Sequence, residues 1–337
     1  MFYWLMLFFV STTAFVAKGK IGNSITVLAA IITAGFIAPG VSQDYYNYLN
    51  GYYLTTPSLY TEPLSKIIFR LSFQLNQPIT VSFLIFAIIS LMIKYNALIK
   101  LNVPISVFFL VYCSKLYLLL DLTQVRAGVA VAICLIALFY RVNGRNKLSL
   151  LYIIIGFLFH YSAIMFLMIF LFSKKHANNA MWLCGVVLSI LFSALDIKGI
   201  LTSLFITLHV PTNYLAYLSI ESDFKVNPFS ILSILNLMIF VIFSFYKGLN
   251  NDVLFNLCYK LYGMSIISFY LFLHFPVLSF RISEFFLIYQ ILLIGLAYNK
   301  TIVNQRWFFL VLLTSYSALQ LYMTYNVAQV IMPYKFV

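Results

Sequence analysis

Charged residues are scarce in this sequence: they make up 9% of the chain, and only eight residues are acidic. A soluble domain carries about 25% charged residues, so the composition excludes a chain built of soluble domains. Hydrophobic residues make up 63%, and apolar runs recur along the whole sequence. The sequence therefore predicts an all-α, polytopic membrane protein with about 10–12 transmembrane helices, in one membrane-embedded domain over 1–337.

The signature motifs of several enzyme classes are also missing. The sequence has no Gly-rich phosphate loop, no Gly-x-Ser-x-Gly and no His-Glu-x-x-His, which argues against an ATPase, a serine hydrolase and a zinc protease. Its four cysteines lie in apolar runs without a Cys-x-x-Cys pair, which supports neither a disulfide framework nor a zinc site. We expect no cofactor. The spacing of Glu221 and Asp223 also fits a divalent cation, although a solvated loop explains it more simply.

The net charge of +13 does not indicate nucleic-acid binding, because the basic residues lie at the ends of apolar runs and form no patch. A separate amphipathic helix is expected over 62–76, lying in the membrane interface with Pro63 in its first turn. Between Val41 and Pro63 the sequence predicts a polar, Tyr-rich loop. The expected membrane segments are 2–17, 21–40, 79–93, 104–120, 127–140, 148–173, 178–195, 229–246, 256–274, 283–299 and 307–324.

The distribution of basic residues predicts the sides of the membrane. With Lys18 in the cytoplasm, alternate crossings place thirteen Lys and Arg inside and seven outside, and seven of the eight acidic residues outside. This count requires that 148–173 begin and end on the same side. One helix of 26 residues would rise about 39 Å and cross once. We favour two half-spans broken near His160, with the single crossing as the alternative.

Arg126 and Arg281 are the arginines expected at outer helix mouths. A guanidinium there can snorkel or pair with a nearby carboxylate, or it can clamp a phosphate, whose charge grows as a pyrophosphate leaves. His160 lies in the middle of an apolar run, where it is either a packing residue or a general base. Glu284 follows Arg281 by three residues, so it shares that helix face and is either a base or a group that orients the arginine.

Further candidates surround these residues. Asp44 and Glu62 are alternative bases, in or beside a tyrosine-rich loop that is either an interfacial belt or a sugar-binding surface. Lys66 and Arg70 lie on one face of the amphipathic helix, where they can hold a lipid headgroup. The remaining candidates for substrate binding are Tyr45, Tyr48, Tyr161, Asp121 and Gln124.

Five short motifs occur in order over most of the chain: Asp44-Tyr45-x-x-Tyr48, Glu62-Pro63, Gln124-Val-Arg126, Phe159-His160-Tyr161-Ser162-Ala163 and Arg281. In these motifs the chain resembles the EpsG family of Wzy-like polysaccharide polymerases. The resemblance implies a membrane glycosyltransferase of the GT-C-like type that joins repeat units carried on undecaprenyl pyrophosphate. It also implies an active site at the periplasmic face of a bacterial inner membrane, with the bilayer and a chain-length regulator protein as partners.

Two other functions remain open at this stage. A flippase or transporter of lipid-linked glycans would need a polar path through the bilayer, and few polar residues are expected in the inner half. A ligase or an acyl-modifying enzyme of the same pathway would differ only in its acceptor or its product.

Overall fold

The computed structural model describes residues 1–16, 19–53, 62–75, 78–195, 199, 203, 206–207, 226–249 and 251–337. The described residues form helices and no strand, which confirms the all-α prediction. Among them, four helices are long and apolar enough to cross a membrane, and six further apolar helices are shorter. The chain divides into two compact units, 1–171 with 294–337, and 172–293.

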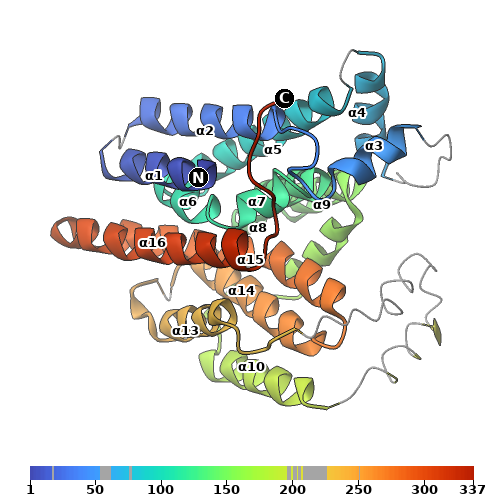
Figure 1. Ribbon diagram of the computed structural model, residues 1–337. Coiled ribbons are helices and arrows are strands. Elements are labelled where there is room, and N and C mark those ends of the chain that lie inside the picture. Colours follow the sequence, from blue (N-terminus) through green and yellow to red (C-terminus); the bar gives the residue numbers. More distant parts are fainter. Residues whose placement is uncertain are drawn as a thin grey trace. The chain divides into compact units, whose positions relative to one another are not determined.

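The main helices of the first unit begin at the N-terminus, and Figure 1 labels the α-helices among them. They are α1 (Phe2–Phe15), α2 (Lys20–Gly35), α3 (Tyr45–Tyr53), α4 (Pro63–Phe73), α5 (Pro78–Lys100), α6 (Ile105–Tyr112), α7 (Leu116–Leu120), α8 (Val125–Val142), α9 (Asn146–Phe159), the 3-10 helix η1 (Tyr161–Phe170) and α16 (Arg306–Leu321) with a π-helical end (Tyr322–Val327). The second unit contains α10 (Asn179–Ser193), α13 (Ile231–Phe245) and α14 (Val253–Leu271), while α15 (Pro276–Lys300) begins there and ends in the first unit.

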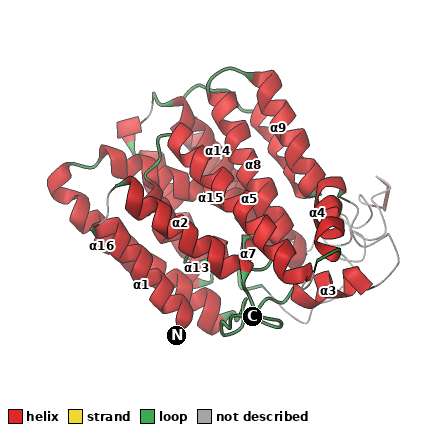
Figure 2. Ribbon diagram, turned by 90° about the horizontal axis from the view of Figure 1, so that it is seen from above, coloured by secondary structure: helices red, strands yellow, loops and turns green. Residues whose placement is uncertain are grey.

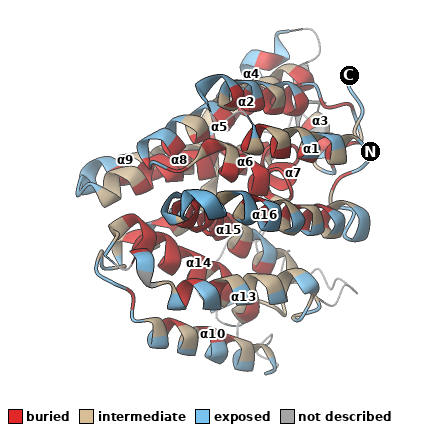
Figure 3. Cartoon of the chain, turned by 90° about the vertical axis from the view of Figure 1, so that its left-hand side faces the viewer, coloured by how far each residue is buried: buried red, intermediate tan, exposed pale blue. Residues whose placement is uncertain are grey.

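Helix α8 is the central helix of the first unit. It contacts α5, α7, α9 and η1, and Figure 3 shows it buried along most of its length. Its small residues, among them Ala127, Gly128 and Ala130, let neighbouring backbones approach closely, as in other membrane helix bundles. This arrangement places the first turn of α8, with Arg126, against several other elements.

The segment 148–173 is broken at His160, as predicted. Helix α9 ends at Phe159, His160 is extended, and η1 follows. At the other end, the Arg141 guanidinium donates to Asn146 Oδ1 at the start of α9 and to the Ile169 carbonyl near the end of η1. The start of α9 and the end of η1 therefore lie at the same end of α8, and the segment is a helical hairpin with His160 at its tip.

The hairpin makes a labelling prediction. Cysteines placed at Lys147 and Lys175, in a chain whose exposed Cys184 has been changed to serine, should react with a membrane-impermeant maleimide from the same side of sealed vesicles. A segment that crossed the membrane once would put them on opposite sides. Cysteine at Lys66, at the other end of the hairpin, provides the opposite-side control.

Two predicted spans differ from the structure. The expected helix 104–120 is divided at 113–115 into α6 and α7. The expected helix 79–93 continues to Lys100, so Lys94 is an interior residue of α5 and not a helix-end topology signal. The Lys94 side chain is fully buried, because it pairs there with Asp121. The charge count places Lys94 among the inside basic residues and Asp121 among the outside acidic residues, whereas the structure pairs them in the interior of the first unit.

Helix α4 begins where the sequence predicts, but its apolar residues are divided between a buried face and an exposed face. Pro63 occupies its first turn, as expected. The face that packs on the protein is Ser65, Ile68, Phe69 and Ser72, whereas Ile67 and Leu71 are exposed. Figure 2 shows α4 beside α3 at one end of the unit. A helix that lies between protein and lipid needs one apolar face for each. In α4 the exposed face with Ile67 and Leu71 is the one that can contact the bilayer.

The C-terminal tail, dark red in Figure 1, pairs with the loop between α2 and α3. Isolated antiparallel bridges join Ile37 to Phe336 and Ser42 to Ile331. The Tyr334 hydroxyl donates to the Thr33 carbonyl at 2.7 Å. The last residues of the chain thereby hold the loop that leads into α3. The polar loop expected after Val41 contains α3. Residues 54–61 of that loop lie outside the described residues.

The second unit packs α10 and α13 on α14. Three polar side chains meet in its interior: Gln290 donates to Asn236 Oδ1 at 3.1 Å and to the Tyr262 hydroxyl at 2.9 Å. Buried Lys260 donates to the carbonyls of Ser173 and Lys175. These contacts satisfy polar groups within apolar helices, which is what membrane-spanning segments require.

Candidate active site

Three side chains that are far apart in the sequence meet at the tip of the hairpin. The Glu62 carboxylate accepts from Arg126 Nη1 at 2.6 Å through one oxygen and contacts His160 Nδ1 at 2.9 Å through the other. The carboxylate is 5% exposed, whereas the Arg126 and His160 side chains are 20% and 23% exposed. An anion that approached this point would therefore meet the arginine and the histidine first, with the carboxylate behind them.

Local structure explains why Glu62 lies here. Pro63 starts α4, and Glu62 is the extended residue just before it. One turn later, the Ser65 hydroxyl donates to the Phe159 carbonyl at 2.7 Å and so caps the end of α9. The α4 helix is thus fastened to the last carbonyl before His160. Ser65 was not among the predicted site residues, because a serine on an amphipathic helix gives no signal of so distant a partner.

Arg126 stands in the first turn of α8, where the helix dipole adds positive potential. Its guanidinium carbon lies 5.6 Å from the centre of the Tyr48 ring, which is a cation–π geometry. Tyr48 in turn stacks on Phe69 of α4. An arginine held by a carboxylate and a ring at a helix N-terminus is suited to bind a phosphate.

Burial of Glu62 favours its neutral form. The hydrogen bond with His160 and the charge of Arg126 oppose this effect and prevail, so the pKa of Glu62 lies below the usual value for a glutamate. The carboxylate is therefore ionised at neutral pH. An ionised carboxylate at Nδ1 fixes the orientation of the imidazole ring and stabilises its protonated form.

This lowered pKa predicts how stability depends on pH. Because the folded-state pKa of Glu62 is below the unfolded value of about 4.3, its contribution is complete above that value and is lost as the pH falls through the folded pKa. The gap in unfolding temperature between the wild type and Glu62→Gln should shrink as the pH falls below about 4.3. Thermal unfolding in detergent measures it. A gap that widens as the pH falls below about 5 would mean that the pKa of Glu62 is raised.

The tyrosines just after the second helix differ in burial. Tyr45 and Tyr48 are buried, with both rings against Phe83, so they support α3 and Arg126 and do not form an open surface for a sugar. Among the tyrosines of α3 whose side chains the structure describes, Tyr46 is exposed, at 52%. Asp44 lies at the start of α3 and accepts from Asn47 at 3.2 Å. Only the register of α3, which no motif reveals, distinguishes these three tyrosines.

Asp121, a candidate for substrate binding from the sequence, is buried in the interior of the first unit. Its side chain is 1% exposed and is paired with Lys94, so it cannot meet a substrate directly. Gln124 precedes α8, and its carbonyl caps the first turn. Tyr161 packs on Phe157 in the hairpin, and Lys66 and Arg70 lie on the surface side of α4.

Residues 21–336 of the chain match the EpsG family. The chain belongs to the EpsG family. This is a family of Wzy-like polysaccharide polymerases, so the match confirms the resemblance predicted from the motifs. No curated protein and no solved structure matches the sequence.

The remaining predicted site residues of this EpsG-family chain are distant in sequence from Glu62, Arg126 and His160. Arg281 and Glu284 stand in the first turns of α15, in the second unit, and their convergence with Arg126 stays a prediction. Glu221 and Asp223 lie outside the described residues. Within the described part of the chain, no group of three or more His, Cys, Asp and Glu side chains lies close enough to hold a metal ion.

Proposed function

We propose that the protein joins oligosaccharide repeat units carried on undecaprenyl pyrophosphate into a long surface polysaccharide such as O antigen, at the periplasmic face of a bacterial inner membrane. The observation that carries the proposal is the Glu62 bridge between Arg126 and His160. A cation for the leaving pyrophosphate and a base for the attacking hydroxyl are what this reaction needs. Membership of a polymerase family supports the same reaction class.

Arg126 would stabilise the leaving group. A guanidinium has five N–H donors, so it can hold Glu62 and a phosphate oxygen at the same time. The carboxylate fixes the side chain in advance, and the N-terminus of α8 points positive potential at the same place. Arg281 would be a second cation for the pyrophosphate. Gln124 and Tyr161, which flank the bridge in sequence, would contact the sugar.

His160 would act as the base. With Nδ1–H donated to Glu62, the neutral ring carries its lone pair on Nε2. The acceptor hydroxyl oxygen attacks the anomeric carbon of the donor glycan, its proton passes to Nε2, and the bond from that carbon to the phosphate oxygen breaks. Undecaprenyl pyrophosphate leaves with the electron pair. Asp44 and Glu284 are the alternative bases.

The lengths of the helices suit a lipid-linked substrate. Helix α8 has 18 residues and α9 has 14, so they rise about 27 Å and 21 Å, less than the ~30 Å hydrocarbon core. Measured from their basic ends, Arg126 and His160 would lie below the outer membrane surface, where a lipid phosphate can reach them. The exposed face of α4, with Ile67 and Leu71 apolar and Lys66 and Arg70 basic, would receive the lipid and its headgroup.

The test is polymerisation in proteoliposomes that contain the purified protein and an undecaprenyl-pyrophosphate-linked repeat unit. Wild type should form long chains and release undecaprenyl pyrophosphate, and His160→Gln should be slower by about 100-fold or more. His274→Gln is the matched control, since that ring bonds the Ser193 carbonyl in the second unit. Translocation of the lipid without polymer would identify a transporter instead. Transfer of one finished block to another acceptor would identify a ligase.

A further inference from the structure

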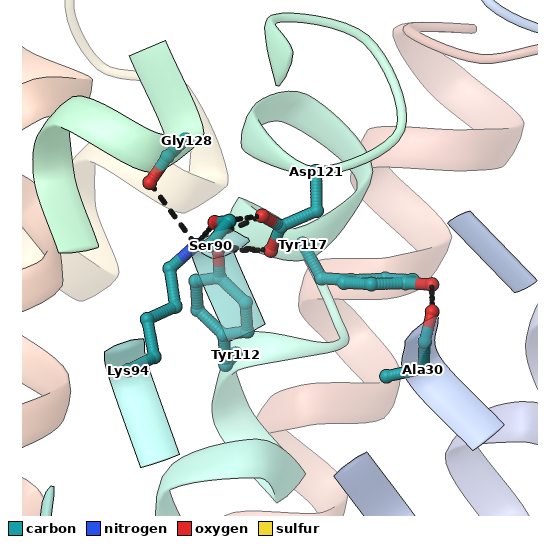
Figure 4. Close-up of polar contacts among 7 residues, drawn as sticks. All are labelled: Ala30, Ser90, Lys94, Tyr112, Tyr117, Asp121 and Gly128. Atoms are coloured by element: carbon teal, nitrogen blue, oxygen red, sulfur yellow. Dashed lines mark hydrogen bonds and ion pairs between the residues drawn. The ribbon is translucent and has the colours of Figure 1, made fainter. Parts of the chain in front are cut away.

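A closed polar cluster lies in the interior of the first unit, shown in Figure 4. Lys94 Nζ lies 2.9 Å and 3.1 Å from the two Asp121 oxygens. The Tyr112 hydroxyl donates to Asp121 Oδ2 at 2.6 Å, and the Ser90 hydroxyl donates to Oδ1. The Lys94 and Asp121 side chains are 0% and 1% exposed. Every charged atom of the cluster is therefore matched by a protein partner.

Such a cluster needs a reason beyond stability. A buried ion pair is costly to desolvate, and apolar residues of similar volume often serve a fold equally well. Ionisable residues inside membrane segments usually have a functional role. Asp121 is too deeply buried to meet a substrate, so a role in the reaction would have to act through a neighbour.

The contacts of the cluster identify that neighbour. Asp121 ends α7, and Lys94 also donates to the Gly128 carbonyl in α8 at 3.3 Å. The Lys94–Asp121 pair therefore contacts both sides of the corner 121–125, which is the turn between α7 and α8: Asp121 follows α7, and the Gly128 carbonyl belongs to α8. Arg126 is the second residue of α8, directly after this corner and two residues before the carbonyl that Lys94 holds.

Other bonds fix the same corner from its far side. The Tyr117 hydroxyl donates to the Ala30 carbonyl of α2 at 2.7 Å, which anchors α7 (Figure 4). The backbone N–H of Gln124 donates to the Leu119 carbonyl at 2.7 Å. Because α7 is anchored in this way, the Lys94–Asp121 pair fixes the position of the first turn of α8 and its rotation about the helix axis. It thereby fixes the position of the Arg126 guanidinium.

We propose that Asp121 and Lys94 are positioning residues for Arg126: they fix the start of α8 so that the guanidinium is placed for a pyrophosphate. This inference rests on the proposed function, in which Arg126 binds that group. A shift of about 1 Å in a binding group can cost as much as 100-fold in rate. The pair therefore affects the reaction although it touches no reacting atom.

The experiment is a double-mutant cycle on binding of undecaprenyl pyrophosphate to the full chain in nanodiscs, with unfolding temperature measured in parallel. Asp121→Asn combined with Lys94→Met removes both charges together. In the wild-type background this change should weaken binding by about 10-fold, and in an Arg126→Ala background by less than about 2-fold, because coupled residues are not additive. Equal losses in both backgrounds, or no loss in the wild type, would overturn the proposal.

A gentler variant keeps the test decisive if the double change unfolds the protein. Tyr112→Phe removes one hydrogen bond to Asp121 and leaves both charges. Its matched control is Tyr262→Phe, since that buried hydroxyl donates to the Asn236 carbonyl at 2.7 Å in the second unit. Tyr112→Phe alone should weaken binding through Arg126. If Arg126→Ala itself binds normally, the proposed function has failed; if only the Tyr112 and Asp121 variants bind normally, the positioning role has failed.

Discussion

Replacing Arg126 by alanine is expected to lower the rate of polymer formation by about 100- to 1,000-fold, the usual effect of removing one group that stabilises transition-state charge. The side chain is held by Glu62 at 2.6 Å and by the Tyr48 ring, so it is already in place before a ligand binds. Chain length of the polysaccharide, normalised to protein level, is the measurement. Arg126→Lys should recover only part of the rate, because an ammonium lacks the planar fork.

Arg141 offers a matched control on the same helix. Its guanidinium also lies over a ring, 5.3 Å from Phe170, and it bonds Asn146 at the opposite end of α8. Arg141→Ala should reduce stability by an amount similar to Arg126→Ala but leave the rate per folded molecule close to wild type. Normal long chains from Arg126→Ala at normal protein levels would end the proposal that this arginine binds the pyrophosphate.

A side chain at Gly128 is expected to disrupt the first unit. A Cβ there would lie 2.4 Å from the Leu120 carbonyl oxygen and 3.0 Å from Asp121 Oδ1, so the backbone of α7 or α8 would have to move. Overpacking of this kind costs about 1–3 kcal/mol, which outweighs the roughly 1 kcal/mol that alanine gains over glycine inside a helix. Gly128→Ala should therefore lower the unfolding temperature, and Gly128→Val should lower the yield of folded protein further.

The control for Gly128 is another glycine inside a helix. A Cβ at Gly185 in α10 would lie 3.4 Å from the end of the Ile267 side chain, which is ordinary contact. Gly185→Ala should be neutral or stabilising. Equal effects of the two substitutions would show that the Leu120 carbonyl moves aside easily and that the α7–α8 corner is not rigid.

The broad features of this protein could be predicted from the sequence because they depend on local patterns. Apolar runs predict helices, Pro63 predicts the start of α4, and the excess length of 148–173 with His160 at its centre predicts a broken span. The order of the short motifs along the chain was enough to indicate the family that the match over residues 21–336 confirms.

The site itself could be predicted only in part, because its contacts join distant positions. Glu62 lies 64 positions from Arg126 and 98 from His160, and no periodicity connects such residues. Arg126, His160 and Glu62 were each candidates from the sequence, but Glu62 was one alternative base among several, and its contact with the other two was not predicted. The partner of Asp121 was missed because Lys94, six residues before Lys100, has the appearance of a charge at the end of a span.

The pairing of the C-terminal tail with the loop before α3 sets an order on biosynthesis. The Gln43 side chain bonds the Gln329 carbonyl, 286 positions later. At about 5–20 residues per second, a ribosome needs roughly 15–60 s to make that stretch. Throughout that interval the loop before α3, the helix that carries the Tyr48 ring beside Arg126, lacks its backbone partners from the tail. The bonds of this loop would therefore be complete only after residues 329–337 have been made, and a nascent chain that stops before them would lack these bonds.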